Sequence, residues 1–187
     1  MKHVSPAVNK KVIEELEKRV TALRTKLAAT KTVRNGDEFI QYKVEKSQAR
    51  FERIRNPNGS DRGRGEFFLL LNVTARTETV YVPLSIASSK KPTGFVYHIE
   101  GTAKGLISTT DISCRGDGIT KVTLGTLLYV KIPKGRTARF RMLIEMRGNV
   151  GKQYAIVINR INYKLHPRDA RYKRFDTEIR SKTLTFH

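Results

Sequence analysis

Hydrophobic residues recur along the chain with two different periods, and the period changes at Thr32. Before Thr32 the apolar positions are three and four residues apart, which is the heptad pattern of packed helices. These positions are Ile13, Leu16, Val20, Leu23 and Leu27. After Thr32 apolar and polar residues alternate, as they do in strands with one buried side. The sequence therefore predicts two domains, an amphipathic or coiled-coil helix over 1–32 and a β domain over 33–187.

The heptad segment covers barely more than two heptads, and Pro6 or Asn9 can open its helix. A helix this short is marginal in water, so its apolar side needs a packing partner. That partner is either a second copy of the helix or the β domain of the same chain. We predict a homo-oligomer held together through Ile13, Leu16, Val20, Leu23 and Leu27, with packing on the β domain as the alternative.

Eight to ten short alternating runs follow, with turn residues between them and no helical pattern to separate them. The runs are Ile40 to Val44, Phe51 to Ile54, Phe67 to Ala75, Val80 to Ile86, Phe95 to Ile99, Ile119 to Leu124, Leu127 to Ile132, Ala138 to Ile144, Tyr154 to Leu165 and Phe175 to Phe186. Closely spaced strands of this kind predict a mainly β fold, an antiparallel β-sandwich of the immunoglobulin-like or jelly-roll type.

Two runs give more detail. In Ala138 to Arg147 the apolar positions alternate with Arg139, Arg141 and Arg147, so three guanidinium groups should share the outward side of one strand. In Tyr154 to Leu165 the alternation changes phase at Asn159-Arg160, which predicts a β-bulge and a bend.

The chain carries 37 basic and 17 acidic residues, a net charge of +20, and more than half of this excess lies in residues 131–187. So large an excess indicates an anionic partner: nucleic acid, a phospholipid surface or an acidic polymer. A solvated surface with no dedicated ligand is the alternative. The residues that we expect to contact the anion are Arg139, Arg141, Arg147, Arg168, Arg171, Lys173 and Arg174.

Tyr172 and Phe175 stand among the last four of these bases. Basic residues beside aromatic rings could hold phosphates while a ring stacks on a base, as in proteins that bind single strands. Alternatively the rings are anchors of the core. We favour the core for Phe175, which continues in one series with Thr177 and Ile179, and leave both possibilities open for Tyr172.

No catalytic or metal-binding pattern is present. The four histidines are scattered, Cys114 is the single cysteine, and Gly63-Arg64-Gly65 precedes a strand and lacks the lysine of a phosphate-binding loop. We therefore expect no enzymatic activity, no metal or other cofactor and no small-molecule substrate. Residues 1–6 lack the apolar core of a signal peptide, and no apolar run is long enough to span a membrane.

The phrase Gly65-Glu66-Phe67-Phe68-Leu69-Leu70-Leu71-Asn72-Val73-Thr74-Ala75, the run Val80-Tyr81-Val82-Pro83 and the run Tyr154 to Tyr163 resemble β-sandwich domains of secreted or surface-attached proteins from candidate-phyla bacteria. The likeness spans roughly residues 50 to 186 and implies a sandwich fold and a cell-surface or extracellular location. Such proteins commonly carry a short heptad segment before the sandwich. This chain lacks their usual leader and any peptidoglycan-binding module.

Two functions are compatible with these features. The first is a non-enzymatic structural or surface protein, a basic β-sandwich that self-associates through its helix and contacts an anionic polymer. The second is a jelly-roll coat protein that packages nucleic acid. Packaging arms tend to be poor in acidic residues, whereas the N-terminal segment contains Glu14, Glu15 and Glu17, which favours the first function.

Overall fold

The computed structural model describes residues 36–54, 62–88 and 93–187. All of them belong to one compact unit, Asn35–His187. The N-terminal helix and the five heptad residues that we expect to mediate self-association lie outside the described residues.

The described residues form twelve strands and no helix. In chain order the strands are β1 (Ile40–Ile54), β2 (Arg62–Ala75), β3 (Val80–Pro83), β4 (Ile86–Ala87), β5 (Phe95–Gly101), β6 (Leu106–Arg115), β7 (Thr120–Leu124), β8 (Leu127–Ile132), β9 (Thr137–Asn149), β10 (Gln153–Tyr163), β11 (Lys173–Arg180) and β12 (Leu184–Thr185). The prediction of a mainly β fold is confirmed.

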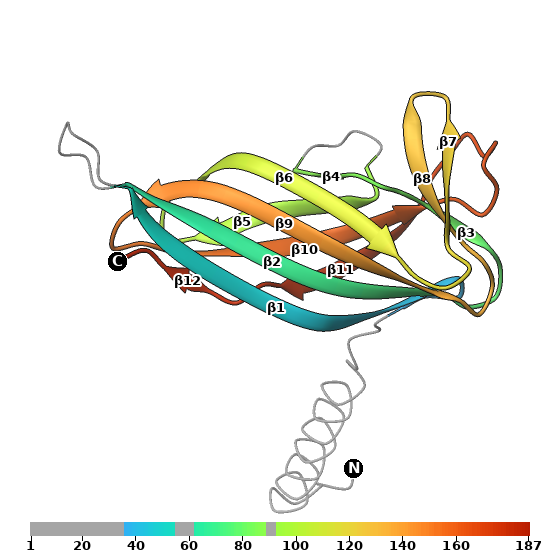
Figure 1. Ribbon diagram of the computed structural model, residues 1–187, viewed down its shortest axis with the longest axis horizontal. Coiled ribbons are helices and arrows are strands. Elements are labelled where there is room, and N and C mark those ends of the chain that lie inside the picture. The colour runs from blue at the N-terminus through green and yellow to red at the C-terminus, as the bar shows by residue number, and fades with distance from the viewer. Residues whose placement is uncertain (1–35, 55–61, 89–92) are drawn as a thin grey trace, which may run out of the picture. The chain divides into compact units, whose positions relative to one another are not determined.

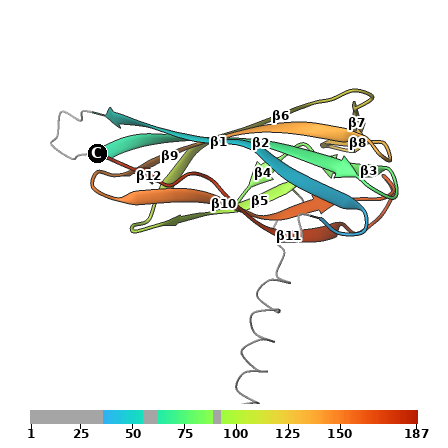
Figure 2. The ribbon, with the colours of Figure 1, turned by 90° about the horizontal axis from the view of Figure 1, so that it is seen from below.

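The strands are arranged in three sheets (Figure 1). The first sheet has the order β1-β2-β9-β6 and the second the order β11-β10-β5-β4, with β12 paired to β10. Figure 2 shows these two sheets as two layers. A third sheet, β3-β8-β7, lies at one end of the layers. All pairings are antiparallel except the short one between β4 and β5.

The first two sheets bury their facing sides in one core. In β2 the predicted inward series Phe67 to Ala75 is at most 1% exposed, and the inward residues of β9 are buried to the same degree. Aromatic rings join the layers: Phe95 of β5 meets Phe140 of β9 with 4.9 Å between ring centroids. Removing this apolar surface from water is the main favourable contribution to the stability of the unit.

Three glycines form a recess on the inward side of the first sheet. A Cβ on Gly65 would lie 2.6 Å from the ring of Phe186, and a Cβ on Gly148 would lie 2.8 Å from the same ring. A Cβ on Gly63 would in the same way clash with the ring of Phe51. Phe186, which is fully buried, fills this recess. The Gly63-Arg64-Gly65 segment therefore makes room for an aromatic ring rather than for a phosphate.

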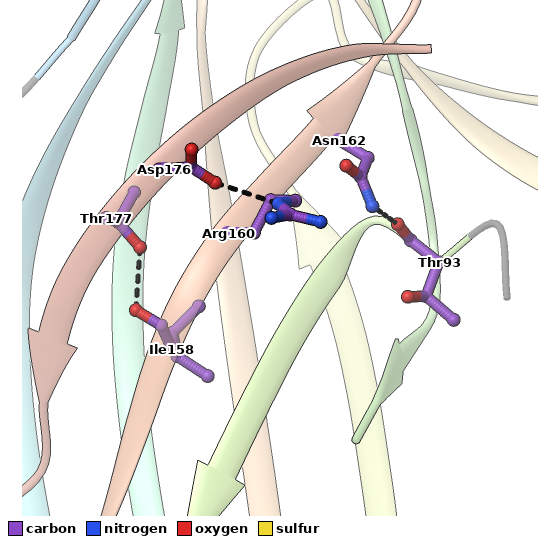
Figure 3. A network of polar contacts seen from close by, with 6 residues as sticks. All are labelled: Thr93, Ile158, Arg160, Asn162, Asp176 and Thr177. Carbon is purple, nitrogen blue, oxygen red and sulfur yellow. Dashed lines mark hydrogen bonds and ion pairs between the residues drawn. The ribbon is translucent and has the colours of Figure 1, made fainter. Parts of the chain in front are cut away.

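The predicted bulge in β10 is confirmed, because its pairing with both neighbours shifts register between Ile158 and Arg160. A bulge disrupts the ladder of backbone hydrogen bonds. Here side chains of β11 compensate, as Figure 3 shows: the hydroxyl of Thr177 donates to the Ile158 carbonyl at 2.6 Å, and Arg160 Nε lies 2.8 Å from an oxygen of Asp176. The bend in β10 is thus held from the adjacent strand.

Some elements differ from the predicted ones. Strand β6 was not predicted, because it is an edge strand rich in serine and threonine whose apolar residues are interrupted by a register shift between Ile107 and Thr109. The two runs predicted within residues 40–54 are one strand, β1, with a shift between Val44 and Lys46. The run Phe175 to Phe186 is divided into β11 and β12, and Val80 to Ile86 into β3 and β4.

Candidate functional site

The arginines of β9 lie where the alternation predicts. Ala138, Phe140, Met142 and Ile144 are buried, and Arg139, Arg141 and Arg147 lie on the other side of the strand. We call the outward side of the sheet β1-β2-β9-β6 the outer face. Cross-strand register then fixes the neighbours of each arginine on this face.

Arg139 already has an acidic partner on the outer face. Glu45, the extra residue at the register shift in β1, accepts two hydrogen bonds from the Arg139 guanidinium, one of them from Nε at 2.6 Å. Directly opposite Arg139 on the adjacent strand β6 is Arg115, which is exposed. Like charges in register destabilise a strand pair. The Glu45 carboxylate offsets part of this repulsion.

Arg141 is exposed and has no ion pair with any described residue. Its guanidinium carbon lies 5.5 Å from the centroid of the Phe68 ring, within the range of a cation–π contact. Phe68 projects from β2 on the outer face beside Leu70 and Leu143, and all three side chains are half-buried. The arginine therefore stands at the centre of an apolar strip.

Two shallow hollows lie on either side of this Arg141–Phe68 contact. The first, of about 410 Å³, is lined by Phe68, Leu70, Ser113, Cys114, Arg115, Arg139 and Arg141. The second, of about 520 Å³, is lined by Lys46, Gln48, Ala49, Arg50, Glu66, Phe68, Arg141 and Leu143. Each hollow has an apolar floor and at least two basic side chains in its wall.

Farther along β9 the outer face is closer to charge balance. Arg64 donates to Glu145 at 2.7 Å and also lies 3.7 Å from Glu66. The hydrogen bond that Arg64 donates to the Glu145 carboxylate raises the pKa of the Arg64 guanidinium. Arg147, which pairs in register with Arg64, is exposed and has no ion pair with a described residue.

The other four predicted anion contacts lie in the segment that links β10 to β11 or at the start of β11. We call residues 164–174 the basic connection. Tyr172 anchors it to the third sheet, since its ring stacks on Tyr129 of β8 at a centroid distance of 6.5 Å and the two hydroxyls hydrogen-bond to each other. Burial and this hydrogen bond raise the pKa of Tyr172. Lys164 Nζ lies 4.8 Å from the centroid of the Tyr172 ring.

These contacts answer the question that the sequence left open for the two rings. Phe175 packs against the core and meets Tyr42 of β1 at 5.9 Å, so the preference for a core role is confirmed. Tyr172 is stacked on Tyr129 and has Lys164 over its ring. Neither ring is placed as an open platform for a base.

Arg168, Arg171, Lys173 and Arg174 are all exposed. Lys173 Nζ lies 4.3 Å from the centroid of the Phe39 ring. Asp169, the acidic residue of the connection, accepts a hydrogen bond from the backbone of His166 at 2.8 Å. The positive charge of these four bases is therefore not compensated by an ion pair with any described acidic side chain.

The structure divides the seven predicted residues between two places rather than gathering them on one surface. Arg139, Arg141 and Arg147 belong to the outer face of the first sheet. Arg168, Arg171, Lys173 and Arg174 belong to the basic connection, whose last two residues are the first of β11 in the second sheet. The alternation within one strand predicts which side of that strand a residue occupies. It does not predict whether residues from different sheets lie on the same surface of the protein.

Sequence reasoning missed several members of the outer face, among them Phe68, Lys46 and Arg115. The sequence could have indicated the first two. Phe68 lies on the outward side of the alternating run Phe67 to Ala75, and Lys46 directly follows the run Ile40 to Val44. Arg115 could not have been indicated, since it lies on β6, the strand that was not predicted.

Within the ranges that the structure describes, no three histidine, cysteine, aspartate or glutamate side chains lie close enough together to hold a metal ion. Burial raises the pKa of the Cys114 thiol to about 11, which leaves it protonated and weakly nucleophilic at neutral pH. No helix in this part of the chain is long and apolar enough to cross a membrane.

Comparison with known proteins gives no assignment. No protein-family model matches the chain. Searches of curated proteins and of solved structures likewise found no match. The resemblance to surface proteins of candidate-phyla bacteria therefore stays a prediction.

Proposed function

We propose that this chain is a non-enzymatic structural or surface protein, a basic β-sandwich that contacts an anionic polymer and self-associates through its N-terminal segment. The outer face and the basic connection provide the contacts with the polymer. A linear polymer long enough to contact both surfaces at once would bind with higher affinity than one that contacts a single surface.

One observation carries the proposal. Six of the seven predicted anion contacts are exposed and have no ion pair with a described residue; they are Arg141, Arg147, Arg168, Arg171, Lys173 and Arg174. Four acidic residues, in contrast, form ion pairs with arginines outside this set of six. The pairs are Glu45 with Arg139, Glu145 with Arg64, Asp176 with Arg160 and Glu100 with Arg180. Uncompensated surface charge of one sign attracts polymers of the opposite sign.

The basic connection is tested with a triple variant, Arg168→Gln with Arg171→Gln and Arg174→Gln. Affinity for heparin and for single-stranded DNA is measured across a salt series. We expect weaker binding and a log–log salt slope that is smaller by about 2 for DNA, because each lost phosphate contact removes roughly 0.7 from the slope. The matched control is Lys104→Gln with Lys152→Gln and Lys182→Gln, which removes the same charge from exposed positions elsewhere.

Binding by the wild type that does not depend on salt, or no binding at all, would contradict the proposal. If the two triple variants and the wild type bind alike, these bases are merely solvated. Tighter binding of DNA than of heparin, with nucleic acid carried through purification, would favour the packaging function instead.

Self-association has a separate test. Leu16→Asp with Leu23→Asp places two charges in the heptad seam, and we expect the oligomer to dissociate because buried unpaired carboxylates are strongly unfavourable. Light scattering measures the molar mass of both proteins. An oligomer of unchanged mass would mean that copies associate through another surface.

A further inference from the structure

The two hollows of the outer face share Phe68 and Arg141, so they are adjacent positions on either side of one cation–π contact. From their lining we propose that they are subsites for successive residues of an acidic polysaccharide, with its sugar rings on the apolar floor and its carboxylates or sulfates at the flanking bases. This inference rests on the proposed function and names the class of polymer.

The charges around the first hollow call for an anion. Arg115, Arg139 and Arg141 line it together, and Arg115 and Arg139 are directly opposite each other in register. Among the described residues, the Glu45 carboxylate forms an ion pair with Arg139 and with no other base. An anionic group between Arg115 and Arg141 would relieve the remaining repulsion between like charges and form charge-assisted hydrogen bonds.

The second hollow repeats this arrangement on the other side of the Arg141–Phe68 contact. Lys46 and Arg50 of β1 face it across the strip from Arg141, and neither has an ion pair with a described residue. Gln48 and Glu66 add hydrogen-bonding groups that suit sugar hydroxyls. Since both subsites share Arg141, one bridging guanidinium would contact two neighbouring residues of the polymer.

The floor distinguishes a polysaccharide from a single-stranded nucleic acid. Proteins that bind single strands stack bases on open aromatic rings. Phe68 is the one aromatic residue in the lining of either hollow, and the Arg141 guanidinium lies over its ring. The rest of the apolar floor is aliphatic, from Leu70 and Leu143. An aliphatic floor can pack against the C–H groups of a sugar ring but gives a base no π surface.

Binding of three hexamers tests the inference by calorimetry: hexagalacturonate, neutral maltohexaose and (dT)6. We expect hexagalacturonate to bind more tightly than (dT)6 and maltohexaose to bind weakest. Arg141→Gln should weaken hexagalacturonate binding about tenfold, the size expected for a lost hydrogen bond to a charged group. The matched control is Lys43→Gln, which removes one charge from the same face but from outside both hollows, and its effect should be less than about twofold.

Two further variants keep the result interpretable. Arg115→Gln tests the first hollow if Arg141→Gln proves unfolded. Leu70→Ser changes the floor without changing the charge, and it should weaken binding of hexagalacturonate but not of (dT)6.

The outcomes separate the inference from the function on which it rests. If the wild type binds none of the three hexamers, nor heparin or longer DNA, the proposed function itself fails. If acidic polymers bind but Arg141→Gln and Lys43→Gln weaken binding equally, the subsites are wrong and the proposed function stands. Tighter binding of (dT)6 than of hexagalacturonate would overturn the assignment to polysaccharides.

Discussion

Replacing Phe186 with alanine should lower the free energy of unfolding by about 3–5 kcal/mol, the usual cost of emptying a phenylalanine site in a core. The ring is fully buried in the recess left by the three glycines, with centroid distances of 4.8 Å to Tyr154 and 5.0 Å to Phe51. The three glycines that line one side of the recess have no side chain that could move into the cavity. Urea denaturation monitored by circular dichroism measures the change.

Gly65→Ala provides an internal check on this prediction. Its added Cβ would lie 2.6 Å from the Phe186 ring, so the single variant should also be destabilised. In a Phe186→Ala background the clash disappears, and the two losses should be clearly less than additive. Leu106→Ala, at a side chain that is 68% exposed, is the neutral control. Additive losses would mean that the ring and the glycines do not share one site.

The second large effect is a loss of stability at alkaline pH. Burial raises the pKa of Tyr42, Tyr97, Tyr163 and Tyr172 above the usual value of about 10. A hydrogen bond from Tyr163 to Asp37 at 2.5 Å adds to the shift of Tyr163. The folded protein then keeps protons that the unfolded chain releases. The stabilisation is complete below pH 10 and is lost as the pH rises through the higher values of the folded state. Each tyrosine should contribute a slope of about 1.4 kcal/mol per pH unit.

Urea denaturation between pH 8 and pH 11 measures this slope. Cys114→Ala is a suitable background, because the raised pKa of the thiol, about 11, would add a similar loss above pH 9. High salt should be present so that titration of lysines has little effect. Tyr163→Phe should reduce the slope by about a quarter, because it removes one of the four tyrosines whose pKa is raised. If every tyrosine ionises near pH 10 in the still folded protein, as read from ultraviolet absorbance, the prediction is wrong.

Alternation made much of the fold predictable, because one side of a strand is buried wherever two sheets face each other. The inward series of β2 and β9 and the bulge near Arg160 could be read for this reason. Strand β6 could not, since an edge strand needs few apolar residues and a register shift breaks their period. The ends of strands were also uncertain: β9 continues to Asn149, beyond the predicted run Ala138 to Ile144, and Gly148 within it makes room for a ring.

The candidate site was predictable at the level of single strands only. The sequence placed Arg139 and Arg141 on one side of β9, and it could not show that Glu45, 94 residues away, neutralises the first of them while Phe68 supports the second. Such partners depend on which strands are neighbours. The order β1-β2-β9-β6 is set by contacts distant in sequence, which local patterns do not encode.

The order of strands in the first sheet has a consequence for folding. The hairpin of β1 and β2 gains its next neighbour only when β9 has been synthesised, and the backbone of Lys182 hydrogen-bonds to Ser47, 135 residues earlier. Contacts of such high sequence separation slow folding to the millisecond-to-second range. Until β9 arrives, the inward row Phe67, Leu69 and Leu71 stays open to water and to other chains. Fragments that stop before β9 should therefore aggregate rather than fold, and the nascent protein would depend on chaperones over that stretch of synthesis.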